Sequence, residues 1–64
     1  MDCILTRYEV VIGKLNGCHT TENYDKYEDA RVRYNAWLRA NYEVHIVVII
    51  IDTEHFTLTR NVLI

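Results

Sequence analysis

The chain has 64 residues, half of them hydrophobic, and a formal net charge of −2. This length allows one small domain spanning residues 1–64, and the hydrophobic content excludes a disordered chain. The small negative charge excludes a general attraction to nucleic acid or to an anionic membrane. The longest apolar run is too short for a membrane span, which needs about 20 residues.

Residues 3–12 predict a first strand, because apolar side chains recur at the even positions. Gly13 then ends or bulges this strand. Asn16-Gly17 is typical of a two-residue type I′ turn, in which both central residues have positive φ. The segment that follows, through residue 21, is either a second strand of a hairpin or a loop that leads into a helix.

Asp25 and Glu28 have the spacing of a capping box, so a helix is expected to begin there and to continue to about Asn41. On a helical wheel, one aromatic-rich face is expected to cover a small sheet. The residues of this face are Tyr27, Ala30, Tyr34, Trp37 and Leu38.

The opposite face of this helix carries the small apolar residues Val32, Ala36 and Ala40, at a spacing of four. Acidic residues flank this stripe in the first turns, and arginines flank it later. One interpretation is a solvated face whose charges complement the helix dipole. The other is a seam between two antiparallel helices, which would make Val32, Ala36 and Ala40 an oligomer interface.

Residues 44–51 predict a strand that is apolar on both faces, because residues 46–51 are all aliphatic and β-branched. One helix can cover one face of a sheet. The other face, with Val47, Ile49 and Ile51, is therefore expected to be an interface with another copy of the chain.

Residues 52–55 form a polar four-residue turn, and a last strand is expected from Phe56 to Ile64. The expected fold is α+β, in the order β-(β)-α-β-β. One helix packs on one face of a three- to four-stranded mixed sheet. Strand 3–12 and strand 44–51 are expected to be parallel, since a helix connects them.

No catalytic or metal site is expected, because no C-x-x-C or H-x₃-H spacing occurs and Ser is absent. His45, at the start of an apolar strand, is interpreted as a packed or edge histidine. No cofactor is expected. The chain does not open with a basic region followed by an apolar segment, so a cytoplasmic protein is expected, with Cys3 and Cys18 as reduced thiols.

Aromatic and arginine side chains on the helix suit stacking on a base and pairing with phosphate. A small anionic ligand of the nucleotide type is therefore one hypothesis, with its site at a subunit interface. The candidate lining residues are Arg31, Arg33, Tyr34, Asn35, Trp37 and Arg39. Binding of DNA or RNA is disfavoured, because the three arginines point in different directions around the helix.

The leading hypothesis is a small non-enzymatic binding protein that self-associates, most simply as a homodimer, and acts by protein–protein interaction. In size and in its lack of catalytic apparatus, the chain resembles the small accessory proteins that phages encode as inhibitors of host defence systems. That resemblance implies a host protein as the partner. No membrane partner is expected, because the net charge is negative and the longest apolar run is short. The alternative is a protein that binds or sequesters a nucleotide.

Overall fold

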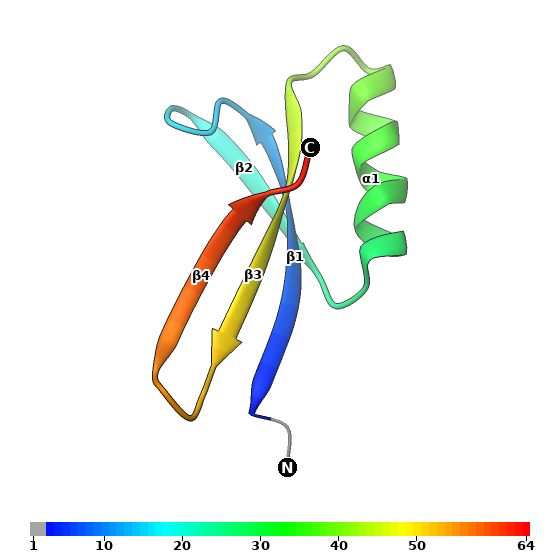
Figure 1. Ribbon diagram of the computed structural model, residues 1–64. Coiled ribbons are helices and arrows are strands. Elements are labelled where there is room, and N and C mark those ends of the chain that lie inside the picture. Colours follow the sequence, from blue (N-terminus) through cyan, green and yellow to red (C-terminus); the bar gives the residue numbers. More distant parts are fainter. Residues whose placement is uncertain (1–2) are drawn as a thin grey trace.

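The computed structural model describes residues 3–64, which form one helix packed on a four-stranded sheet (Figure 1). The predicted α+β class and the β-β-α-β-β order are confirmed, and the segment left open between strand and loop is a strand. In chain order, the elements are β1 (Ile4–Gly13), β2 (His19–Tyr24), α1 (Tyr27–Arg39), β3 (Val44–Asp52) and β4 (Thr57–Val62).

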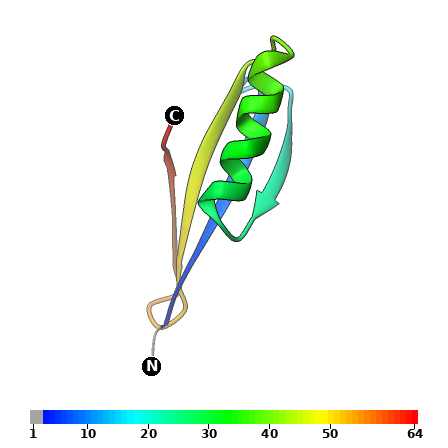
Figure 2. The same ribbon diagram turned by 90° about the vertical axis from the view of Figure 1, so that its right-hand side faces the viewer.

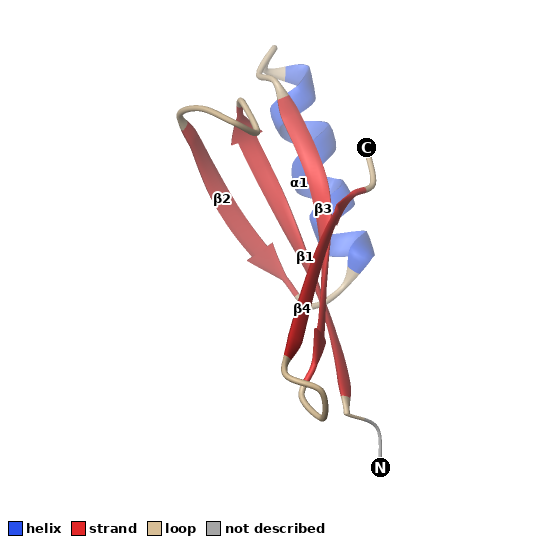
Figure 3. Ribbon diagram, turned by 60° about the vertical axis from the view of Figure 1, so that its left-hand side comes forward, coloured by secondary structure: helices blue, strands red, loops and turns tan. Residues whose placement is uncertain are grey.

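The sheet has the strand order β2-β1-β3-β4 and is antiparallel at every step (Figure 3). The predicted mixed sheet, with β1 parallel to β3, is therefore wrong. The physical reason is β2. Its hairpin adds one reversal of chain direction between β1 and β3, which turns a parallel pair into an antiparallel one.

The core lies between α1 and one half of the long strands β1 and β3. Because side chains alternate along a strand, the even-numbered residues of both strands face the helix. Each fully buried Val or Ile stabilises the fold by about 1.5–3 kcal/mol. The buried cluster consists of Val10, Ile12, Ala30, Val44 and Ile46, with Tyr8, Tyr24, Tyr34 and Trp37 packed against it.

The helix covers part of one face. It contacts β1, β2 and β3, and it makes no contact with β4 within residues 3–64. Figure 2 shows α1 lying against one end of the sheet, with β1, β3 and β4 running on beyond it. The molecule is accordingly elongated, with extents of 41 × 24 × 15 Å. Half of the sheet therefore has no helix on either face.

The predicted capping box is wrong. The helix begins at Tyr27 after Lys26, and no side chain among residues 3–64 caps its first turn. Asp25 instead forms an ion pair with Arg7 of β1, which removes its carboxylate from the helix end. Leu38, expected in the core, is 50% exposed. It lies roughly 80° around the helix from the buried Ala30, at the flank of the packed face.

The helix ends in a Schellman motif, close to the predicted end. Asn41 has a φ of 67°, and its N–H donates to the carbonyl of Leu38. The N–H of Tyr42 donates to the carbonyl of Trp37, and the two rings meet edge to face at 5.2 Å. These bonds satisfy carbonyls at the helix end and turn the chain back toward β3.

The turn between β1 and β2 is longer than predicted. The N–H of Gly17 donates to the carbonyl of Lys14, and neither Asn16 nor Gly17 has the positive φ of a type I′ turn. In this hairpin the residue with positive φ is Gly13, at 118°. A Cβ on Gly13 would lie 2.7 Å from the carbonyl oxygen of Cys18, so the hairpin needs glycine there.

The turn between β3 and β4 is shifted by one residue from the prediction. Asp52 pairs with Thr57, which leaves Phe56 in the turn with a φ of 55°. The Asp52 carboxylate accepts the N–H groups of Glu54 and His55 and also bonds the His55 ring. These bonds, the ring contact first, hold the pKa of Asp52 below its usual range. Phe56, expected at the start of the last strand, is 93% exposed.

Candidate functional site

The face of the sheet opposite the helix, called here the helix-free face, is built from cross-strand rows. Directly opposed residues of antiparallel strands point to the same side. One row joins Leu5, Ile51 and Leu58. The next joins Arg7, Ile49 and Arg60, and a third joins Glu9, Val47 and Val62.

The row at the far end of this face is apolar and uncovered. Leu5 is exposed, Ile51 is half-buried, and Leu58 is 61% exposed. Phe56 lies beside Ile51 and Leu58, and the three residues line a hollow at the β3–β4 turn. The half of the sheet that has no helix therefore presents four neighbouring apolar side chains to solvent.

The middle of the helix-free face carries paired charges. Arg60 of β4 forms an ion pair with Glu9 of β1, and β3 lies between those two strands. The Arg60 side chain therefore crosses β3 and shields Val47, which is 3% exposed. The expectation that another copy must cover Val47 is wrong, because this chain covers the residue itself.

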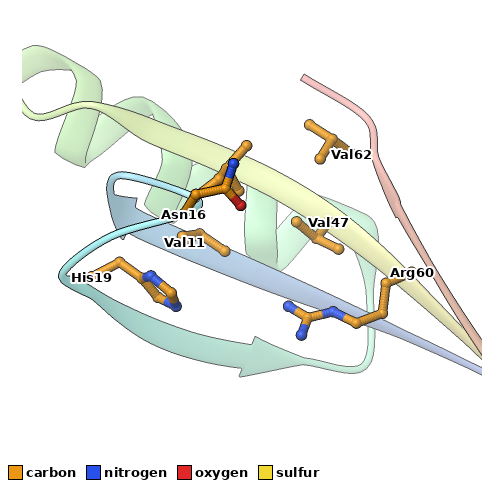
Figure 4. Close-up of a pocket in the computed structure, with 7 residues that line it drawn as sticks. Val11, Asn16, His19, Val47, Arg60 and Val62 are labelled. Atoms are coloured by element: carbon orange, nitrogen blue, oxygen red, sulfur yellow. The ribbon is translucent and has the colours of Figure 1, made fainter.

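A groove of about 450 Å³ lies next to this ion pair. Figure 4 shows Val11 and Val47 between His19 on one side and Arg60 with Val62 on the other. Its lining combines apolar and polar side chains, as binding grooves do, and Val11 and Val47 at the bottom are almost fully buried. The lining residues are Val11, Leu15, Asn16, His19, Val47, Arg60 and Val62.

His19 is fixed by the β1–β2 turn. Its Nδ1 lies 3.0 Å from the carbonyl oxygen of Lys14 and 2.9 Å from that of Gly17. Because carbonyl oxygens only accept hydrogen bonds, Nδ1 carries a proton. The turn therefore holds the imidazole at one end of the groove.

On the helix side, Glu22 of β2 is the centre of a hydrogen-bond network. Arg33 donates to both of its carboxylate oxygens at 3.1 Å, Tyr24 donates at 3.0 Å, and the Trp37 indole donates at 3.3 Å. The Arg33 bond is the main cause that holds the pKa of the Glu22 carboxyl below its usual range. Burial, followed by the bond to Glu22, raises the pKa of Tyr24. The network fastens α1 to the edge strand β2.

The six helix residues nominated for a small anionic ligand line neither of the two hollows described above. Arg33 and Trp37 are bonded to Glu22, and Arg31 lies over the ring of Tyr34 at 5.2 Å. Neither hollow described above includes them or the two remaining candidates. Those two are Asn35 and Arg39, both exposed.

The other nominated interface residues lie on opposite sides of the molecule. Val32, Ala36 and Ala40 are exposed on the outer face of α1, and Val32 retains 66% of its accessible surface. Ile49 and Ile51 are half-buried on the helix-free face. The helix stripe and the sheet face are therefore separate surfaces.

The cysteine and histidine residues are dispersed. Cys3 and Cys18 lie beyond opposite ends of β1, whose ten residues span about 33 Å, so a bridge between them would require unfolding the strand. His45 contacts Glu43, and His55 contacts Asp52. Within residues 3–64, no three His, Cys, Asp or Glu residues form a group that could hold a metal ion.

Sequence reasoning missed Phe56, Asn16, His19 and Arg60. One signal was available: Leu58, Arg60 and Val62 alternate with Thr and Asn along the last strand, which placed the arginine on the apolar face. No comparable signal existed for His19. Its place in the groove depends on the five-residue turn and on the pairing of β1 with β3.

Comparison with protein-family models, with curated proteins and with solved structures gave no match. Within residues 3–64, no helix is long and apolar enough to cross a membrane.

Proposed function

We propose that this chain is a non-enzymatic binding protein that self-associates and acts by protein–protein interaction. The observation that carries the proposal is the half of the sheet without a helix. There, Phe56 and Leu58 are 93% and 61% exposed, beside a strand β4 in which every residue is exposed.

Such an arrangement is unfavourable for an isolated chain. An edge strand offers unpaired N–H and C=O groups, and soluble proteins usually guard it with Lys, Pro, a bulge or a covering loop. Strand β4 contains one charged residue, Arg60, and that guanidinium is turned inward to Glu9. Contiguous exposed apolar side chains next to an open edge favour a protein partner.

The partner that we propose beyond self-association is a host protein, in the manner of the small phage-encoded inhibitors of defence systems. The compartment that we propose is the cytosol, where Cys3 and Cys18 would remain thiols. A 64-residue domain buries a small core, and a partner on the uncovered half of the sheet would extend it.

A nucleotide-type ligand on the helix has less support. A phosphate would have to displace Glu22 from Arg33, and the same carboxylate also accepts from the indole of Trp37. For this reason we propose protein binding as the function.

Sedimentation velocity over a range of micromolar concentrations tests the self-association. The variant Leu58→Lys places a charge in the exposed apolar row, and Val32→Lys places the same charge on the outer face of the helix at nearly equal exposure. We expect the wild type and Val32→Lys to form dimers and Leu58→Lys to remain monomeric, with all three folded by circular dichroism. A monomeric wild type would overturn the proposal. A monomeric Val32→Lys beside a dimeric Leu58→Lys would move the interface to the helix.

A further inference from the structure

Three features of β4 and its surroundings are unexplained by the single chain. The first is the outer edge of the strand. The N–H of Leu63 donates to the carbonyl of Ile46 on β3. Because backbone groups alternate sides along a strand, those of Leu58, Arg60 and Val62 point away from β3. The second feature is Phe56, exposed at positive φ, and the third is the groove that ends at Val62.

A second copy of the chain can pair with this edge in antiparallel fashion about a two-fold axis. A register centred on Arg60 would place two arginines directly opposite each other, and like charges in that position are unfavourable. A register centred on Thr59 opposes threonine to threonine. It also places Leu58 of each copy beside the base of the Arg60 side chain of the other, whose guanidinium points away to Glu9.

The Thr59 register has a second consequence. Residues that pair across the axis are equally far from Thr59 in the sequence, on opposite sides of it. Phe56 of one copy, three residues before Thr59, therefore lies opposite Val62 of the other copy, three residues after it. Val62 lines the groove together with Val47 and Val11. Phe56 borders a hollow whose lining includes Ile51 and Leu58, which point to the helix-free face, and Asp52 and Thr57, which point to the other face. Its ring is 93% exposed and can lie on the helix-free face, on which the partner's groove opens.

We infer that two copies pair through β4 about an axis at Thr59, and that Phe56 of each copy enters the groove of the other. The inference rests on the proposed self-association and specifies its geometry. The result is a continuous eight-stranded sheet with both helices on one side, since an axis normal to the sheet keeps equivalent faces together.

The groove suits an aromatic side chain. Its lining includes the apolar side chains of Val62 and Leu15, with Val11 and Val47 beneath them. A six-residue edge alone buries little surface compared with the roughly 800 Å² per partner of standard interfaces. Insertion of Phe56 adds a buried anchor at each end of the paired strands.

Disulfide trapping tests the register. In a background with Cys3→Ala and Cys18→Ala, the variant Thr59→Cys places two thiols opposite each other at the axis. The expected Cα separation is about 4.5 Å, because this is a non-hydrogen-bonded pair. Thr57→Cys is the matched control on the same face. Its two thiols are offset by four residues, about 13 Å along the strands.

With a mild oxidant, we expect a covalent dimer from Thr59→Cys and monomer from Thr57→Cys. Equal or greater trapping of Thr57→Cys would overturn the register. Absence of trapping in both variants, in a protein that still sediments as a dimer, would overturn the β4 pairing and leave the self-association standing. A wild type that sediments as a monomer would remove both.

Phe56→Ala tests the insertion separately. The side chain is almost fully exposed in the single chain, so the variant is expected to fold as the wild type does. We expect its dimer dissociation constant to rise at least tenfold, whereas Glu54→Ala, in the same turn, leaves it unchanged. An unchanged constant for Phe56→Ala would overturn the insertion.

Discussion

Gly13 occupies a backbone conformation that other residues rarely adopt. Its φ is 118°, and the carbonyl of Cys18 fills the space where a Cβ would lie. We expect Gly13→Ala to lower the free energy of unfolding by about 2 kcal/mol, because backbone strain and a clash with backbone atoms add. Urea denaturation measures the difference.

Gly17 provides the control for this prediction. It has no positive φ, and an added Cβ would lie 3.3 Å from the Cβ of Lys14 and clear of backbone atoms. Gly17→Ala should therefore change the free energy of unfolding by less than about 1 kcal/mol. Equal effects of the two substitutions would show that the hairpin does not depend on the conformation of Gly13.

Glu22 links stability to pH. Its folded pKa lies below the usual 4.5, chiefly because of Arg33. A carboxyl with a lowered folded pKa stabilises the fold above its unfolded pKa, and this contribution is lost as the pH falls through the folded pKa. We expect Glu22→Gln to lower the free energy of unfolding at pH 7 by about 1 kcal/mol, since the pair is partly exposed.

The same comparison should give a smaller difference as the pH falls through the folded pKa of Glu22, because the wild-type carboxyl then binds a proton. Other titrating groups contribute equally to both proteins and cancel. A difference that stays constant from pH 7 down to the acid limit of the folded state would contradict the role assigned to the Glu22 charge.

At the scale of elements, the end of α1 gives a direct prediction. Asn41 adopts the left-handed conformation of a Schellman motif, which glycine adopts with less strain. We expect Asn41→Gly to be neutral or stabilising by up to about 1 kcal/mol, and Asn41→Val to be destabilising by about 1–2 kcal/mol. Thermal unfolding measures both, and a more stable valine variant would contradict the motif.

The elements themselves were largely predictable from the sequence. The run 46–51 predicted β3, and the spacing of Ala30, Tyr34 and Trp37 predicted the packed face of α1. Local rules failed where a distant partner competed with them. Asp25 pairs with Arg7 and does not cap the helix. Asp52 pairs with Thr57, so Phe56 lies in the turn and not in the strand.

At the scale of the molecule, the sequence predicted that one helix could not cover both faces of the sheet. It predicted Val47, Ile49 and Ile51 as the uncovered side chains, whereas Val47 is buried and the other two are half-buried. The ion pair of Arg60 with Glu9 spans 51 positions in the sequence and hides Val47. The uncovered part is instead the far half of the sheet, because β1 and β3 extend beyond α1.

The candidate site was correspondingly harder to predict than the fold. A groove between the β1–β2 turn and β4 requires the strand order β2-β1-β3-β4, and that order depends on the direction change introduced by β2. The helix arginines were predicted as ligand-binding residues, but two of them, Arg31 and Arg33, contact side chains of the same chain. Arg33 is the clearest case, since Glu22 occupies its guanidinium fork.

Amide hydrogen exchange, measured by NMR at low and high protein concentration, tests the pairing of β4 most directly. The amides of Thr59 and Asn61 point to β3 and should be protected at both concentrations. We predict that the amides of Leu58, Arg60 and Val62 exchange rapidly in dilute protein and become protected as the concentration rises. Rapid exchange of those three amides at every concentration would contradict the account.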